Sequence, residues 1–246
     1  MAGVLALTAA CTAQSDSDTT ARQRTAPTGP TTPSPAKSPT RAPTRSPADP
    51  AADLDLLRAA RSGATDAVRD AIERGADPET RDEHRRTPLL LAVTGDHVAA
   101  ARILVEAGAD PDALDRQHDT PWLVTGVTGS AAMARTLAAA HPDYTVVNRY
   151  GGTSLIPASE RGHVDYIREV TTNPEIDIDV DHVNNLGWTA LLEAVILGDG
   201  GQDHQRAVEL LLDAGADRSL SDRNGVSPLQ HAQQKGYTEI ARMLRG

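Results

Sequence analysis

A short threonine-containing motif returns along the chain at a fixed interval, and this periodicity restricts the fold more than any other feature. Thr87, Thr120 and Thr153 are each 33 residues apart, and a looser register continues at Thr189 and Ser227. The motifs are Thr87-Pro88-Leu89, Thr120-Pro121-Trp122, Thr153-Ser154-Leu155, Thr189-Ala190-Leu191 and Ser227-Pro228-Leu229. A second motif marks the far end of three units, at Gly75-Ala76-Asp77, Gly108-Ala109-Asp110 and Gly215-Ala216-Asp217. A period of this length predicts a repeat protein.

These motifs resemble those of ankyrin repeats over roughly residues 52–246. The resemblance implies an all-α solenoid in which each unit is a β-turn followed by two antiparallel helices. A single unit cannot bury its apolar face, so neighbouring units stack into one continuous core. We place six units at about 52–81, 82–114, 115–147, 148–183, 184–221 and 222–246.

The second unit shows the physical logic of such a repeat. The hydroxyl of Thr87 can cap the first helix, and Pro88 suits the first helical position, where no N–H is needed. The second helix should end at Gly108. The side chains expected to point into the stack are Leu89, Ala92, Ile103, Leu104 and Ala107.

The composition fits close helix packing and argues against an anionic partner. Among 246 residues there are two Trp, four Tyr and no Phe, so the core has to consist of Ala, Leu, Val and Ile. The net charge is −10, and residues 12–50 carry five Lys or Arg against three Asp, which leaves −12 on the repeats. Because phosphates would be repelled, we expect neither nucleic acid nor anionic lipid as the main partner. Lys occurs only at positions 37 and 235, a bias towards Arg that suggests a GC-rich bacterial genome.

The single cysteine, Cys11, ends an apolar run and resembles the lipid-attachment cysteine of a bacterial lipobox. Small residues precede it, as a lipoprotein signal peptidase requires, and the segment 1–11 is too short to span a bilayer. No Lys or Arg precedes the run, which suggests an upstream start codon, and Thr8 stands where Leu is usual. We expect an exported protein that is lipid-anchored to the outer face of the bacterial cell membrane. The alternative is an accidental Ala-rich start in a cytoplasmic protein.

Residues 12–50 read as a disordered linker before a repeat domain at 51–246. They contain eight of the sixteen prolines together with many Thr, Ser and Ala, a composition that cannot bury enough apolar surface to fold. An extended chain of this length could reach roughly 100 Å, which suits a tether. The alternative is a proline-directed regulatory or docking tail at Ser38-Pro39 and Ser46-Pro47.

The turn tips carry the candidate binding residues. The usual Asp-x-x-Gly-x-Thr turn lacks its glycine at 82–87 and 115–120, so we expect those tips to be strained or remodelled. By family resemblance the intervening side chains project towards partners, and aromatic residues and Arg are the types that form interface hot spots. On three adjacent tips these are Arg149, Tyr150, Leu186, Trp188, Arg223 and Val226. The alternative for Trp188 is packing on the neighbouring hairpin.

Two insertions interrupt the period and are expected to flank this patch, near the same face or edge. The motif spacing grows to 36 residues between Thr153 and Thr189 and to 38 between Thr189 and Ser227. In the first insertion, residues 172–181 alternate apolar and acidic side chains, which suits an extended hairpin. The second, 198–204, is expected to be a flexible loop between the two helices of unit five. Insertions in repeat proteins often lie on the binding face, and tolerated drift is the alternative.

No catalytic or metal-binding pattern emerges. Asp177, Asp179 and Asp181 have the spacing that opens a calcium loop, but the turn glycine and the closing Glu are missing. The resemblance implies a structural role for His97 and His163; a weak surface metal site beside His182 and His204 is the alternative. There is no phosphate-binding loop or nucleophile elbow. We expect no enzyme, no cofactor and no metal.

The sequence therefore predicts a monomeric, membrane-tethered module that binds a protein partner through its turn tips and concave face. The alternative is an envelope scaffold or stress-protective protein that supports an exported enzyme.

Overall fold

The computed structural model describes residues 50–246, and the predictions for segments 1–11 and 12–50 concern residues outside that range, apart from Pro50. Twelve helices fill the described part of the chain, two in each unit. The first helices of the units are α1 (Pro50–Ser62), α3 (Pro88–Thr94), α5 (Pro121–Thr128), α7 (Leu155–Glu160), α9 (Ala190–Ile196) and α11 (Pro228–Gln234). The second helices are α2 (Thr65–Glu73), α4 (Val98–Glu106), α6 (Ala131–Ala138), α8 (Val164–Thr172), α10 (Gln202–Asp213) and α12 (Thr238–Arg245).

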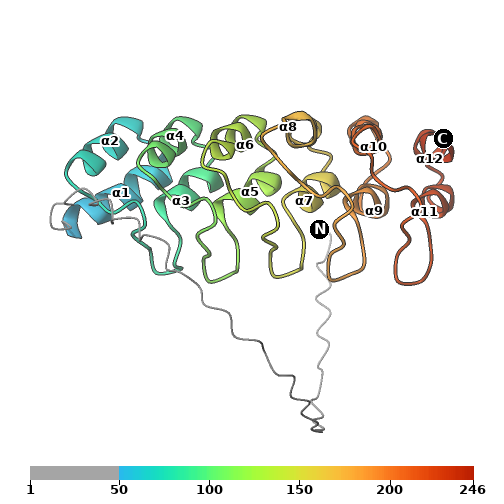
Figure 1. The fold of residues 1–246 in the computed structure, drawn as a ribbon, viewed down its shortest axis with the longest axis horizontal. Helices are drawn as coiled ribbons and strands as arrows, with labels where there is room; N and C mark the ends of the chain where they lie inside the picture. The colour runs from blue at the N-terminus through green and yellow to red at the C-terminus, as the bar shows by residue number, and fades with distance from the viewer. Residues whose placement is uncertain (1–49) are drawn as a thin grey trace, which may run out of the picture. The chain divides into compact units, whose positions relative to one another are not determined.

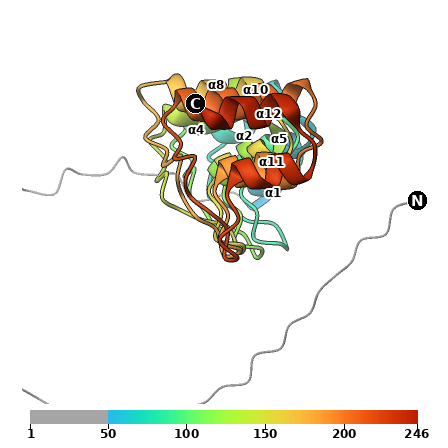
Figure 2. The ribbon, with the colours of Figure 1, turned by 90° about the vertical axis from the view of Figure 1, so that its right-hand side faces the viewer.

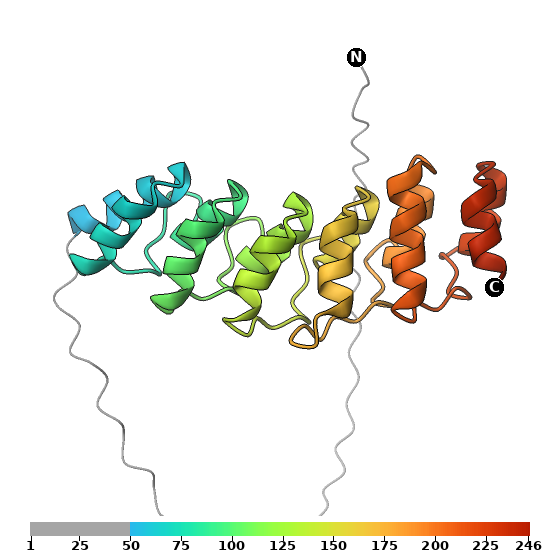
Figure 3. The same ribbon diagram turned by 90° about the horizontal axis from the view of Figure 1, so that it is seen from above.

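The helices form two layers in one elongated row. Each first helix packs on the first helix of the next unit, and the second helices do the same above them (Figure 1). A view along the row shows both layers, with the hairpin-shaped turns projecting below the first helices (Figure 2). From above, the second helices lie side by side (Figure 3). The predicted all-α solenoid of six two-helix units is confirmed for residues 50–246.

Hydroxyl caps explain where the first helices begin. The N–H of Leu90 donates to the Thr87 hydroxyl at 3.2 Å, and Pro88 occupies the first helical position, as predicted. The same cap starts the first helices of units three, five and six, through Thr120, Thr189 and Ser227. A hydroxyl at the unit start therefore sets the register of each of these helices.

The core runs without interruption through the row and is made mostly of Ala and Leu. Leu89, Ala92 and Leu104 are fully buried, as predicted, whereas Ile103 and Ala107 are half-buried at the edge of the stack. Trp122 and Tyr166 are the largest fully buried side chains, so the aromatic part of the core lies in units three and four. Small Ala side chains let adjacent helices approach closely, which is how a chain without Phe fills its interior.

Candidate protein-binding groove

Every turn tip of units two to six is built around one Asp or Asn side chain. In tip four, residues 148–153, the Asn148 side-chain oxygen accepts the N–H groups of Tyr150 at 2.9 Å and Gly152 at 3.1 Å. The same two bonds are made in the other tips by Asp82, Asp115, Asn184 and Asp222. This side-chain scaffold holds the turn, so the residues between are free to vary.

The two tips without glycine keep the same turn. Arg85 and His118 take the position of Gly151, with φ of 64° and 60° against 71° for the glycine. A left-handed backbone is unfavourable for residues with a Cβ, so the predicted strain is present. Of the two predicted outcomes, strain or remodelling, the structure shows strain, because the Asp82 and Asp115 side chains hold the turn in its usual shape.

Neighbouring tips are joined to one another along the lower edge of the row (Figure 1). The Arg116 N–H donates to the His84 carbonyl at 3.1 Å, and the Asn185 N–H donates to the Tyr150 carbonyl at 2.9 Å. The Arg223 side chain donates to the Asn185 carbonyl. Tips two and three are therefore joined, and so are tips four, five and six.

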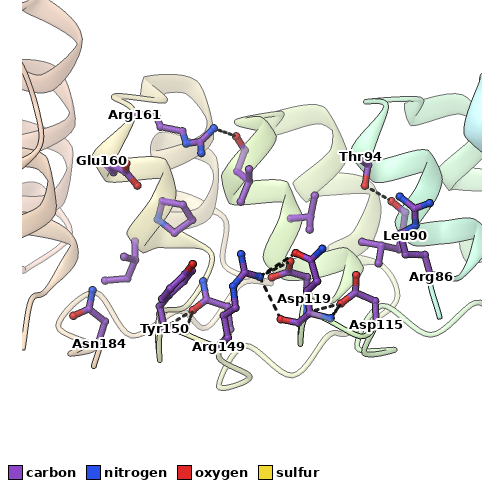
Figure 4. A pocket seen from close by; sticks show the side chains of 17 residues that line it. Arg86, Leu90, Thr94, Asp115, Asp119, Arg149, Tyr150, Glu160, Arg161 and Asn184 are labelled. Carbon is purple, nitrogen blue, oxygen red and sulfur yellow. Dashed lines mark hydrogen bonds and ion pairs between the residues drawn. The ribbon is translucent and has the colours of Figure 1, made fainter. Parts of the chain in front are cut away.

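A groove of about 440 Å³ lies between the tips and the first helices of units two to five (Figure 4). Its floor is apolar and consists of Leu90, Val124, Val127, Ile156 and Pro157. Its other lining residues are Arg86, Thr94, Asp115, Gln117, Asp119, Asn148, Arg149, Tyr150, Gly152, Glu160, Arg161 and Asn184. An apolar floor with a polar and charged rim is the usual composition of a site that takes another polypeptide.

Arg149 organises the rim of the groove. Its Nη1 lies 3.3 Å from a carboxylate oxygen of Asp119, and its guanidinium carbon stands 4.7 Å from the ring centre of Tyr150 (Figure 4). Burial raises the pKa of Asp119, and the Arg149 charge opposes that shift. The guanidinium therefore orients Tyr150, which stays 61% exposed, beside a partly buried carboxylate.

The structure places the six candidate residues on adjacent tips, but only two of them line the groove. Arg149 and Tyr150 do so, while Leu186 is 54% exposed on the next tip. Arg223 is exposed on the last tip; Trp188 and Val226 are half-buried within their tips. Sequence reasoning missed the floor, which consists of Leu90, Val124, Val127, Ile156 and Pro157. For all of these except Val127, the signal is their register, three or four positions after each unit's leading Thr.

The first insertion follows α8 and contains no strand. Ile176 is buried while the acidic residues on either side of it are exposed, so the alternation reports one extended stretch lying on the core. The Tyr144 hydroxyl donates to the Glu175 carbonyl at 3.0 Å and ties this stretch to unit three. The predicted hairpin is wrong, because contacts with the stack replace pairing with a second strand.

The second insertion lies at the opposite end of the helices, so the two insertions do not share an edge. Only residues 197–201 separate α9 from α10, and Gln202 to His204 already belong to α10. His204 makes hydrogen bonds of 2.9 Å to Asp199 and to the Glu160 carbonyl, and the Tyr237 hydroxyl donates to the Gly198 carbonyl at 2.9 Å. The loop follows the C-terminus of α9, whereas the first insertion leads towards its N-terminus.

Histidines at the turns between paired helices join neighbouring units. The Nε2 atoms of His97 and His163 lie 3.2 and 3.3 Å from the carbonyl oxygens of Arg61 and Val127, which confirms their structural role. His204 makes the same kind of bond, and His182 lies 2.7 Å from the Gly151 carbonyl oxygen. Among residues 50–246, no three His, Cys, Asp or Glu side chains gather in a way that could hold a metal ion.

A buried carboxyl group stands behind the end of the groove. Glu193 on α9 is 4% exposed and accepts a 2.8 Å hydrogen bond from Asn184, the scaffold residue of tip five. Burial raises the pKa of Glu193 to about 7; the nearby Glu160 adds to the shift and Asn184 opposes it. In unit six the equivalent pair is His231 and Asp222, 3.0 Å apart.

Within the described residues, no helix is long and apolar enough to cross a membrane.

Comparison with known proteins agrees with this architecture. YahD, an ankyrin repeat protein of Escherichia coli (strain K12), is 37% identical over 190 residues, covering 77% of this chain and 94% of that protein. The crystal structure of an ankyrin repeat domain from Acinetobacter baumannii AYE superimposes with a TM-score of 0.73 at 43% identity, covering 77% and 95% of the two chains. The ankyrin repeat domain of Bcl-3, a member of the IkappaB protein family, has a TM-score of 0.69 at 27% identity, covering 78% and 84%.

The family pattern described as "Ankyrin repeats (3 copies)" matches residues 56–148 and 175–246. Domains of this kind generally mediate protein–protein interaction and are typically not enzymes. The period of 33, the paired helices, the projecting tips and these matches lead to one assignment. The chain belongs to the ankyrin repeat family.

Proposed function

We propose that this protein binds a protein partner in the groove between its turn tips and first helices, with Tyr150 on the rim and Leu186 on the next tip as apolar anchors. The observation that carries the proposal is the apolar floor of the groove beside two large exposed side chains that the fold does not require. Exposed Tyr and Leu on adjacent tips can be desolvated together by one partner surface. The mixed charges of the rim suit a polypeptide better than a polyanion.

Two leucines of equal exposure provide a matched test. Leu186 on tip five is 54% exposed, and Leu197 at the opposite end of α9 is 50% exposed. Partner capture by the full chain should fall for Leu186→Ala and stay unchanged for Leu197→Ala. Tyr150→Ala should weaken binding by at least about 2 kcal/mol, roughly thirtyfold.

Titration of the captured partner, with melting temperatures recorded for each variant, checks this prediction. Equal losses for the two leucine variants would place the interface elsewhere. Trp188→Ala separates the two roles of that half-buried side chain: a lower melting temperature marks packing, and a weaker complex at unchanged melting temperature marks contact with the partner. If the captured protein is an envelope enzyme, the scaffold function is favoured over capture of a peptide or signalling domain.

We further propose that the module is a monomer tethered by a lipid on Cys11 to the outer face of a bacterial membrane. Support comes from the small residues before Cys11 and from the Pro- and Thr-rich segment 12–50. Cys11→Ser should move the protein from the membrane fraction to the soluble fraction, and limited proteolysis should cut first between Thr12 and Pro50. Membrane association that survives Cys11→Ser would refute the anchor without touching the binding proposal.

A further inference from the structure

Unit four begins its first helix differently from its neighbours, and Pro157 is the cause. In the other capped units, the residue four positions after the cap donates its N–H to the cap's own carbonyl, as Val124 does to Thr120 at 3.1 Å. Pro157 occupies this position in unit four and has no N–H. The Ile156 N–H donates to the Thr153 carbonyl at 3.2 Å instead, and the buried Thr153 hydroxyl is left without a partner.

The junction between units three and four is also unusually polar. Units two and five place the apolar pairs Ala92-Val93 and Ala194-Val195 at the middle of their first helices, and all four side chains are fully buried. The equivalent positions in units three and four hold Thr125-Gly126 and Ala158-Ser159.

Only part of this polar junction is satisfied. Thr125 shares a 2.8 Å hydrogen bond with Tyr166, but the buried Ser159 hydroxyl has no partner. A buried polar group without a hydrogen bond weakens the packing around it. A Cβ at Gly126 would stand 1.8 Å from the Ser154 carbonyl oxygen, so at this point the two first helices meet through their backbones.

The tips across this junction are held by one side chain. Tips two and three are joined by a backbone hydrogen bond, and so are tips four and five. Between tips three and four, the bonds among the described residues come from Arg149 Nη1, which lies 3.3 Å from the Gln117 carbonyl, from its side-chain oxygen and from Asp119. Bonds of this length from an exposed guanidinium can be exchanged for water or for a partner at little cost.

We infer that the array bends at the junction between units three and four, with Pro157 weakening the packing of the first helices and Arg149 acting as the clasp between the tips. Bonds from Arg135 to Glu169 and from Tyr144 to the Glu175 carbonyl still join the two units away from the tips. Most of unit four, residues 149–174, lies between the two stretches matched by the family pattern. The groove crosses the junction, because Val124 and Val127 lie on one side and Ile156 and Pro157 on the other. Bending therefore changes the width of the groove. This consequence rests on the proposed function, whereas the bending itself does not.

Two spin-label pairs of equal span test the inference in the full chain with Cys11→Ser. One pair, Asp66→Cys with Ala132→Cys, joins α2 to α6 across units one to three; the other, Ala132→Cys with Asp203→Cys, joins α6 to α10 across units three to five. All three positions are exposed on second helices, away from the groove. The pair that spans the junction should give a distance distribution roughly twofold broader than the other pair, since local motion follows weak packing.

Two variants act in opposite directions on the junction. Pro157→Val supplies the missing N–H with the residue type of Val124, and should narrow the distribution of the spanning pair to that of the control pair. Arg149→Ala should broaden it further, and neither variant should change the control pair. Equal widths for the two pairs in the parent chain, or a spanning pair unmoved by both variants, would overturn the inference. These measurements need no partner, so failure of the binding proposal would leave them interpretable.

Discussion

At the scale of single residues, Glu193 is the group whose surroundings most alter its chemistry. Its carboxyl group is buried beneath tip five and accepts a hydrogen bond from Asn184. Asn184 is neutral, so it cannot offset the charge of the ionised carboxylate as a cation would. The pKa of Glu193 rises from an ordinary 4.5 to about 7 because the charged form loses its hydration. This carboxyl group is therefore protonated in the folded state at pH values where it is ionised in the unfolded chain.

This shift predicts that the free energy of unfolding falls as the pH rises from about 4.5 to about 7. Below that window both states hold the proton, and above it both have lost it, so the Glu193 contribution is flat outside. The loss amounts to at most about 3 kcal/mol. Glu193→Gln keeps the acceptor for Asn184 and removes the titration, so urea unfolding from pH 5 to 8 should lose this part of the slope.

Glu239→Gln on the exposed face of α12 is the matched control and should leave the slope of the parent chain intact. If Glu193→Gln shows the same pH dependence as the parent, the carboxyl group is not the source. The parent chain and Glu193→Gln differ in this one carboxyl group, so the difference between their slopes isolates Glu193.

At the scale of elements, replacing the capping Thr by Val should change stability in different ways in units three and four. The Thr120 hydroxyl accepts the Leu123 N–H at 3.1 Å, whereas the Thr153 hydroxyl is buried and unpaired. Thr120→Val should therefore cost about 1 kcal/mol. Thr153→Val keeps the shape, removes an unsatisfied group, and should be neutral or stabilising by up to about 1 kcal/mol. Urea titrations of the two variants check this, and a similar loss in both would contradict the difference between the caps.

At this scale, features that depend on nearby residues could be predicted from the sequence, whereas features that depend on contacts between units could not. Thr87 and His97 could be assigned their roles because cap and turn chemistry acts within a few residues. The extended stretch around Ile176 was misread as a hairpin, because alternation reports which side is buried and not what covers it. The groove floor at Val124 and Ile156 was missed for the same reason: it is assembled from neighbouring units, and only its register is written in each.

At the scale of the whole molecule, the row gains its stability from contacts between neighbouring units. Each first helix has a helix on either side, except at the two ends of the described array. Stability is then close to a sum of unit and interface contributions, so the effect of a substitution depends on its place in the row. One continuous core therefore runs from Ala52 to Leu244.

The stacking arrangement predicts a large cost for a cavity in the middle of the row and none for a change on its surface. Leu191 on α9 is 1% exposed and packs between units four and six, so Leu191→Ala should lower the free energy of unfolding by about 2–5 kcal/mol. Glu239 is exposed on the last helix, where its partner Arg242 is exposed too, and Glu239→Ala should stay within about 0.5 kcal/mol of the parent. Urea titration followed by circular dichroism measures both. Because every unit leans on its neighbours, the cavity at Leu191 should also lower the cooperativity of the transition, whereas equal losses from the two variants would mean that the units do not share one core.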